Sequence, residues 1–185
     1  MEESIMVQCS YKRFDGTFCE EEALPGSPNG YCIFHEELEN KDIEGCMRLF
    51  YQKLRNGEEN FEGYILKDVD LPKAGIKEIK QRVLFLNTKF YGDASFKNIE
   101  FKEYVDFLMA IFGGKVDFSK AKFEGWVNFS GATFEGGVDF SEATFEGGAY
   151  FLEAKFEGWA YFLEAKFEGW AYFLEAKFEG GVDFS

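Results

Sequence analysis

Histidine is nearly missing from the 185-residue sequence, and this scarcity limits the catalytic sites that the chain can form. The single histidine is His35, so any Ser-His-Asp or Cys-His nucleophilic arrangement would have to use it. No apolar run approaches the length of about 18 residues that marks a membrane-spanning helix. The sequence therefore supports neither a membrane protein nor most histidine-dependent enzymes.

Basic residues are also scarce, since 20 lysines and arginines stand against 34 aspartates and glutamates, and the net charge is -14. An acidic protein repels phosphate, so we expect no direct binding of nucleic acid. The first residues, MEESIMVQCS, carry acids where a secretory signal has basic residues, and no apolar segment follows them. A hydrophobic fraction of 46% argues against disorder. We expect a soluble, cytoplasmic protein.

Phenylalanine is abundant, and its spacing is regular. Of the 24 phenylalanines, 19 between Phe85 and Phe184 follow one register in which gaps of 6 and 5 alternate, so the period is 11. The residue two positions before each of them is always small or β-branched. An internal repeat of this kind is the signature of a stacked architecture.

The repeat predicts short strands and not helices. Gaps of five and six would scatter phenylalanine around a helix, and the glycine-rich segment FEGGVDFSEATFEGG disfavours helix formation. In a strand, Val138 and Phe140 point the same way while Asp139 points away. The Glu-Gly and Gly-Gly steps then supply corners. Each unit is therefore one short side of a coil, with its phenylalanine inward.

The units AKFEG, ATFEG and VDFSE resemble those of the pentapeptide-repeat family over about residues 85–184. This resemblance implies a mainly β protein, a right-handed quadrilateral parallel β-helix in which four units close one coil. The regular longer unit, as in FEGWAYF, departs from the family pattern. Two repeats would then close one coil with an extra corner residue on alternate sides, and a triangular helix is the weaker alternative.

We divide the chain into a zinc-binding module at 1–39, a helical and degenerate-repeat cap at 40–84, and the repeat β-helix at 85–185. A helix is predicted over 40–56, with Ile43, Met47, Phe50 and Leu54 on one face. Segment 61–71 looks like a degenerate first piece of the coil. Segment 75–83, GIKEIKQRV, is predicted as a short helix that interrupts it.

The first forty residues contain a candidate metal site formed by Cys9, Cys19, Cys32 and His35. The Cys-x-x-His step places two donors on one tight turn, and four such donors fill a tetrahedral zinc coordination, which is typical of a structural site. A segment this short and polar needs metal binding to fold. Disulfides or unrelated thiols are the alternatives. Cys46 is left over, and we expect it to be a small core residue.

A similar Cys…Cys…CIFH segment precedes the repeats in proteins of the pentapeptide-repeat family, so the resemblance also implies a structural Zn2+ site here. Catalysis has little support, because carboxylates such as Glu153 and Glu164 recur with the repeat and no phosphate-binding loop is present. We expect a non-enzymatic scaffold for protein–protein interaction or self-association.

Aromatic and leucine side chains replace polar ones at outward positions from residue 149 onward. They form either a binding surface or a ladder that stabilises neighbouring coils, and Tyr150 should stack on Tyr172 and Leu152 on Leu174. The candidate partner surface consists of Tyr150, Leu152, Trp159, Tyr161, Leu163, Trp170, Tyr172 and Leu174.

Two further expectations concern partners. The sequence stops within a repeat at Ser185, so the C-terminal coils either pair with another copy in a homodimer or continue in a longer protein. Some members of the family are acidic rods that imitate duplex DNA and occupy DNA gyrase, and the resemblance implies this as an alternative function. Lysines at 155, 166 and 177 interrupt the acids and argue against it.

Overall fold

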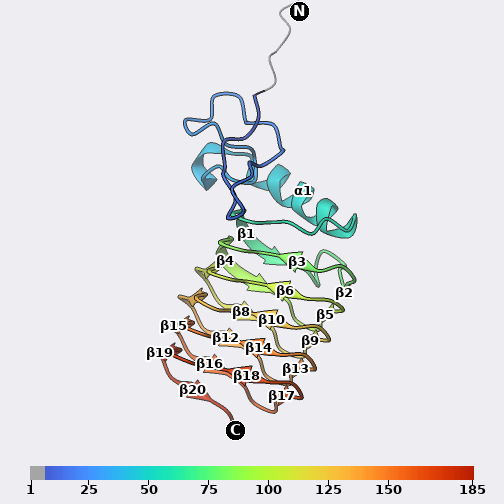
Figure 1. Ribbon diagram of the computed structural model, residues 1–185, viewed down its shortest axis with the longest axis vertical. Helices are drawn as coiled ribbons and strands as arrows, with labels where there is room; N and C mark the ends of the chain where they lie inside the picture. The colour runs from blue at the N-terminus through green and yellow to red at the C-terminus, as the bar shows by residue number, and fades with distance from the viewer. Residues whose placement is uncertain (1–6) are drawn as a thin grey trace, which may run out of the picture.

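The computed structural model describes residues 7–185, so residues 1–6, on which part of the signal-peptide interpretation rests, lie outside the described residues. The chain forms a stack of β-coils with a loop-rich N-terminal region and one α-helix at one end, and the C-terminus lies at the other end (Figure 1). Among residues 7–185, no helix has the length and apolar character needed to cross a membrane.

The predicted helix is confirmed as α1 (Ile43–Arg55), which follows the short 3-10 helix η1 (Leu38–Asn40). The Asp42 side chain caps α1 by accepting a hydrogen bond from the backbone N–H of Gly45 at 3.0 Å. Phe50 and Leu54 are buried, and Phe50 contacts the ring of Phe61 with 5.4 Å between centroids. The helix therefore covers the N-terminal end of the stack, as a solenoid requires.

The strands form four faces, which we call A to D in chain order around one coil. Face A contains β2 (Glu78–Ile79), β5 (Glu100–Phe101), β9 (Lys122–Phe123), β13 (Thr144–Phe145) and β17 (Lys166–Phe167). Face B contains β3 (Val83–Leu84), β6 (Val105–Asp106), β10 (Val127–Asn128), β14 (Ala149–Tyr150) and β18 (Ala171–Tyr172). Face C contains β7 (Ile111–Phe112), β11 (Thr133–Phe134), β15 (Lys155–Phe156) and β19 (Lys177–Phe178), and face D contains β8 (Val116–Asp117), β12 (Val138–Asp139), β16 (Ala160–Tyr161) and β20 (Val182–Asp183). The longer β4 (Lys89–Ser95) turns the corner between faces C and D, and β1 (Ile65–Asp70) pairs with it.

The strands of each face pair in parallel, and partners in the regular coils are separated by two repeats. Val127, for example, pairs with Val105 on one side and with Ala149 on the other. The predicted four-sided coil of two repeats is therefore confirmed, and the triangular alternative is wrong. Because faces follow one another in the order A, B, C, D, faces B and D lie on opposite sides of the solenoid.

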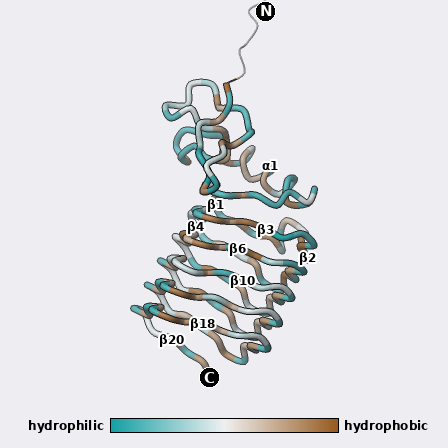
Figure 2. The backbone as a smooth tube through the Cα atoms, in the orientation of Figure 1, coloured by the Kyte–Doolittle hydropathy of each residue, from teal (hydrophilic) through white to brown (hydrophobic). Residues whose placement is uncertain are grey.

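Phenylalanine rings stack in columns inside the coil. In one column Phe107 lies 5.0 Å from Phe129, and Phe129 lies 5.1 Å from Phe151, between ring centroids. All three rings are fully buried. Figure 2 shows hydrophobic residues recurring at the same place in successive coils. The stacked rings fill the interior of the coils, and each coil contacts only its neighbours.

The prediction of a helix over 75–83 is wrong, because the coil already begins there. Ile79 pairs with Phe101 and Val83 with Val105, and both are buried in β2 and β3. The spacing of Ile76, Ile79 and Val83 fits a helix locally, but pairing with the next coil decides the structure. The predicted coil-like segment at 61–71 is confirmed, since β1 pairs with β4.

Glycines at two opposite corners of the coil, such as Gly136 and Gly147, allow the backbones of neighbouring coils to approach one another. A Cβ atom at Gly136 would overlap the backbone of Gly114 in the coil before it, whereas a Cβ at Gly137 would lie 3.4 Å from its nearest neighbour, the Trp159 carbonyl oxygen. We therefore expect Gly136→Ala to lower the free energy of unfolding by about 1–3 kcal/mol, as overpacking does. Gly137→Ala should lower the free energy of unfolding much less. Urea titration of both variants measures the two losses. Equal effects of the two variants would contradict the predicted backbone overlap.

Candidate metal centre

The N-terminal loops bring together the side chains of Cys9, Cys19, Cys32 and His35. A short antiparallel pairing aligns the first two cysteines, since the backbone N–H of Cys9 donates to the Glu21 carbonyl and that of Cys19 donates to the Tyr11 carbonyl. A tight turn brings in the other two residues, with the His35 N–H donating to the Cys32 carbonyl at 3.1 Å. The predicted Cys-x-x-His turn is therefore present.

The four donor atoms have the separations of a compact coordination shell and lie within 4.8 Å of one another. His35 Nδ1 is 3.2 Å from Cys32 Sγ and 3.5 Å from Cys9 Sγ, and Cys19 Sγ is 3.9 Å from Cys32 Sγ. A tetrahedral ion with metal–sulfur bonds of about 2.3 Å has ligand–ligand edges of about 3.8 Å. All four residues are buried. The cluster can therefore hold a metal ion.

Neighbouring groups orient His35 for this role. Its Nε2 lies 2.9 Å from the Glu62 carbonyl oxygen, to which it can donate a hydrogen bond, and this tautomer leaves the Nδ1 lone pair facing the cysteines. The Tyr11 ring stacks on the imidazole at 3.9 Å with an angle of 4°. Neither contact can be predicted from the sequence, since a carbonyl partner such as that of Glu62 leaves no trace in residue type and the stacking of Tyr11 depends on the fold.

Hydrogen bonds from backbone N–H groups lower the pKa of a thiol, whereas burial raises it. The N–H of Cys32 donates to Cys9 Sγ at 3.2 Å, and the N–H of Glu21 donates to Cys19 Sγ at 3.5 Å. The hydrogen bond with Cys32 lowers the pKa of Cys19 to about 4, while that same bond and burial raise the pKa of Cys32. Burial also raises the pKa of Cys9. Within this pair, Cys19 is therefore the sulfur that is more readily held as a thiolate.

Cys46 lies outside this cluster. It is buried on α1 within the hydrophobic core, and burial raises the pKa of its thiol. The expectation that Cys46 is a small core residue is confirmed.

The metal cluster is joined directly to the first coil of the solenoid. The Glu62 side chain accepts a hydrogen bond from the Phe14 N–H at 2.7 Å, in addition to the contact of its carbonyl with His35. The N–H of Ile65, the first residue of β1, donates to the Phe34 carbonyl at 2.7 Å. Ordering of the cluster and ordering of the first coil are therefore coupled.

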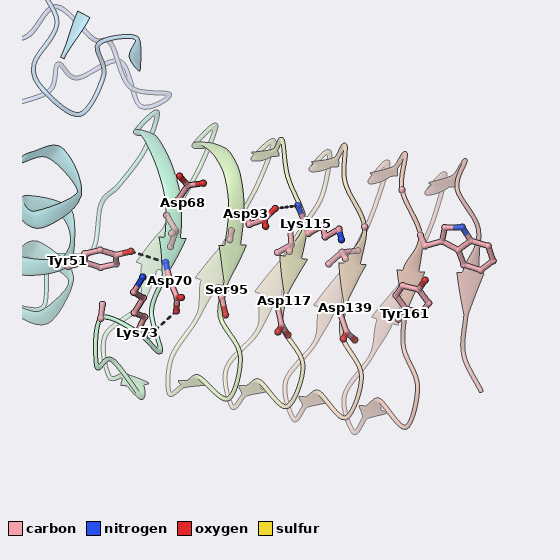
Figure 3. Close-up of a pocket in the computed structure, with 18 of the residues that line it drawn as sticks. Tyr51, Asp68, Asp70, Lys73, Asp93, Ser95, Lys115, Asp117, Asp139 and Tyr161 are labelled. Carbon is pink, nitrogen blue, oxygen red and sulfur yellow. Dashed lines mark hydrogen bonds between the residues drawn. The ribbon is translucent and has the colours of Figure 1, made fainter. Parts of the chain in front are cut away.

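Face D carries a groove of about 1290 Å³ that runs from α1 along the strands to Trp159 (Figure 3). Aspartates and lysines line it, and several of them are engaged in holding the backbone. Asp93 Oδ1 accepts from the Lys115 N–H at 2.9 Å, and Asp70 Oδ1 accepts from the Lys73 N–H at 2.9 Å. Its lining residues include neither histidine nor cysteine.

The residues of the predicted partner surface separate onto two opposite faces. One repeat is half of a coil, so consecutive copies of the same sequence alternate between faces B and D. Tyr150 stacks on Tyr172 as expected, with ring centroids 5.2 Å apart. Face B and its flanks carry Tyr150, Leu152, Trp170, Tyr172 and Leu174, and face D and its flanks carry Trp159, Tyr161 and Leu163.

Trp126 also lies with the residues of face B, outside the predicted partner surface. Its ring lies 5.6 Å from that of Tyr150, and Trp170 stacks on Tyr172 at 6.4 Å. The repeat itself indicates this position, because Trp126 and Trp170 are separated by two full coils and therefore occupy equivalent places on the same face. We call Trp126, Tyr150, Trp170 and Tyr172 the aromatic face.

Comparison with known proteins agrees with this architecture. The family described as Pentapeptide repeats (9 copies) matches residues 85–133, 96–144 and 140–185, which together span more than half of the chain. No curated protein and no solved structure matches the sequence. The matched residues coincide with the regular coils of the solenoid. The chain therefore belongs to the pentapeptide-repeat family.

Proposed function

We propose that the protein is a non-enzymatic scaffold that binds another protein through the aromatic face, and that a structural zinc ion orders its N-terminal end. The single observation that carries the proposal is the exposure of large aromatic side chains on a rigid surface: Trp126 is 59% exposed and Trp170 is 77% exposed. Exposed, clustered aromatic residues are enriched at protein interfaces.

Zinc is the ion that the donor set favours. Three thiolates and one imidazole are a common structural zinc shell, and the four donors leave no position open for a substrate. The cysteines are free thiols in the structure, which suits a reducing compartment, and we propose a cytoplasmic location on this basis.

The alternative of an acidic rod that imitates DNA has less support. Lysines are paired with the acids along face A, where Lys102 lies 2.8 Å from Glu124 and Lys122 lies 3.0 Å from Glu146. These pairs interrupt the negative charge where a continuous row of acids would be needed. Self-association through the C-terminal coils is a further alternative, and light scattering of the purified chain measures it.

A pull-down from cell lysate with matched baits tests the scaffold function. The baits are the intact chain, Trp126→Ser/Trp170→Ser on face B, and Trp159→Ser on face D. We expect a partner that is captured by the intact chain and by Trp159→Ser but lost with the double variant. Capture that is equal for all three baits would contradict a binding role for the aromatic face. A topoisomerase among the captured proteins would instead favour the DNA-mimic alternative.

A further inference from the structure

We infer that the aromatic face receives a basic amphipathic α-helix of a partner protein, lying along the axis of the solenoid. This inference rests on the proposed function and adds the chemistry of the partner. It comes from three properties of face B: a continuous column of rings, carboxylates on both flanks, and a repeat distance close to that of a helical turn.

The rings of the aromatic face form one continuous apolar column across three coils. Trp126 contacts Tyr150 at 5.6 Å, Tyr150 stacks on Tyr172 at 5.2 Å, and Tyr172 contacts Trp170 at 6.4 Å. Gly148 leaves room for this column, since a Cβ there would lie 3.2 Å from the Tyr150 ring. Leu174, which is 67% exposed, widens the apolar surface at one edge. A partner must therefore offer apolar side chains.

Carboxylates flank this column on both sides. Glu146 and Glu168 lie at the corner with face A, in neighbouring coils, and Glu153 and Glu175 lie at the corner with face C. The coils that carry the last two are joined by the hydrogen bond from the Glu153 N–H to the Leu174 carbonyl at 2.9 Å. All four glutamates are exposed.

No basic side chain arises from the face itself to neutralise these acids. The three segments that cross it, 124–131, 146–153 and 168–175, contain neither lysine nor arginine. Lys122 on face A pairs with Glu146 at 3.0 Å and offsets its charge, so the flanking charge available to a partner comes mainly from Glu153, Glu168 and Glu175. The flanks of the aromatic column therefore complement a segment with apolar residues in its centre and lysine or arginine on both sides.

The dimensions of face B match those of an α-helix. The extended stretch from Trp170 to Leu174 is roughly 13 Å long at about 3.3 Å per residue, and a helix with its side chains is about 10–12 Å across. Coils repeat every ~4.8 Å, and a helix rises about 5.4 Å per turn. A helix along the solenoid axis thus presents about one residue per turn to each glutamate column. Flexible lysine side chains accommodate the small difference between the coil spacing and the rise of one helical turn.

A second copy of this chain is the less suitable occupant. A two-fold contact between two aromatic faces would bring their glutamate columns together, and each chain carries a net charge of -14. Like charges placed opposite one another at an interface are unfavourable. The charge pattern therefore selects a basic partner over self-association at this face.

A fluorescent model helix tests the inference directly. The probe is an amidated peptide with two heptads of Lys-Leu-Leu-Lys-Lys-Leu-Leu, and its control is a scrambled peptide of the same composition without an apolar face. Fluorescence anisotropy with the intact chain should show binding of the amphipathic peptide and at least tenfold weaker binding of the scrambled one. Affinity should fall as salt is raised.

The repeat supplies matched variants for both parts of the surface. Trp126→Ser/Trp170→Ser should weaken peptide binding at least tenfold, while Trp159→Ser on the opposite face should leave it within twofold. Glu153→Gln/Glu175→Gln should weaken binding and reduce its salt dependence. Glu142→Gln/Glu164→Gln changes the equivalent turn positions at the corner between faces D and A. This variant should change neither the affinity for the peptide nor its salt dependence. Circular dichroism confirms that each variant is folded.

The outcomes separate this inference from the proposed function. Equal losses with the face B and face D tryptophan variants, or equal binding of the scrambled peptide, would overturn the helix-binding inference. If a lysate partner depends on Trp126 and Trp170 but the amphipathic peptide does not bind, the scaffold function stands and the partner chemistry is wrong. If neither binding depends on these residues, both proposals fail.

Discussion

Phe129→Ala is expected to lower the free energy of unfolding by about 3–5 kcal/mol, because it removes a fully buried ring from the middle of the stack. The ring lies between Phe107 at 5.0 Å and Phe151 at 5.1 Å, so its loss leaves a cavity bounded by two rigid coils. Coils in a solenoid are stabilised by their neighbours, and a weakened central coil uncouples the two halves. Urea unfolding followed by circular dichroism measures the loss and would show a broadened transition.

Phe184→Ala is the control within the same repeat register. Phe184 is 56% exposed and stacks on one side only, on Phe162 at 4.9 Å. We expect Phe184→Ala to lower the free energy of unfolding much less than Phe129→Ala does. A Phe129→Ala variant that unfolds at the same urea concentration as the wild type would contradict the stacked-ring core.

Cys32→Ser is expected to abolish stoichiometric metal binding and to unfold the N-terminal module. Structural zinc sites in small domains contribute on the order of 10 kcal/mol of binding free energy to folding, and Cys32 is central to this cluster, within 3.9 Å of Cys19 Sγ and 3.2 Å of His35 Nδ1. Elemental analysis would measure the metal content. Limited proteolysis would show cleavage within residues 7–39 and the adjoining first coil, while the later coils resist digestion.

Cys46→Ser is the matched control, since Cys46 is equally buried but lies outside the cluster. This variant should keep one metal ion per chain and resist proteolysis in the N-terminal module. Full metal content in Cys32→Ser, or loss of metal from both variants alike, would contradict the assignment of the four ligands. Removal of the metal from the wild type with a chelator should reproduce the proteolysis pattern of Cys32→Ser.

Much of the fold follows from the sequence because the repeat is strict. Alternating gaps of 5 and 6 between phenylalanines predict short strands with a period of 11, and the resemblance to the pentapeptide-repeat family implies that four units close one coil. The pairing of Val127 with Val105 and Ala149 confirms this coil of two repeats. The clustering of Cys9, Cys19, Cys32 and His35 could also be predicted, since Cys-x-x-His is a local pattern and the other two cysteines lie within the same short segment. The supporting contacts of Tyr11 and Glu62 could not, because they depend on how the module meets the first coil.

Two predictions went wrong or stayed incomplete for physical reasons that the repeat explains. Ile79 and Val83 have a spacing that suits a helix, yet pairing with Phe101 and Val105 extends the coil into this segment. The change to outward aromatic residues predicts one partner surface, whereas half of a coil separates consecutive copies of the repeat. Trp159 and Trp170 therefore share a local sequence and lie on opposite faces.

Hydroxyl-radical footprinting of the chain alone and with its captured partner tests the central claim most directly. The method reports which exposed aromatic side chains become protected when a complex forms, and all three tryptophans are more than half exposed in the free chain. We predict that the partner protects Trp126 and Trp170 and leaves Trp159 as reactive as before. Protection of Trp159 with no change at Trp126 and Trp170 would contradict the assignment of the aromatic face as the binding surface.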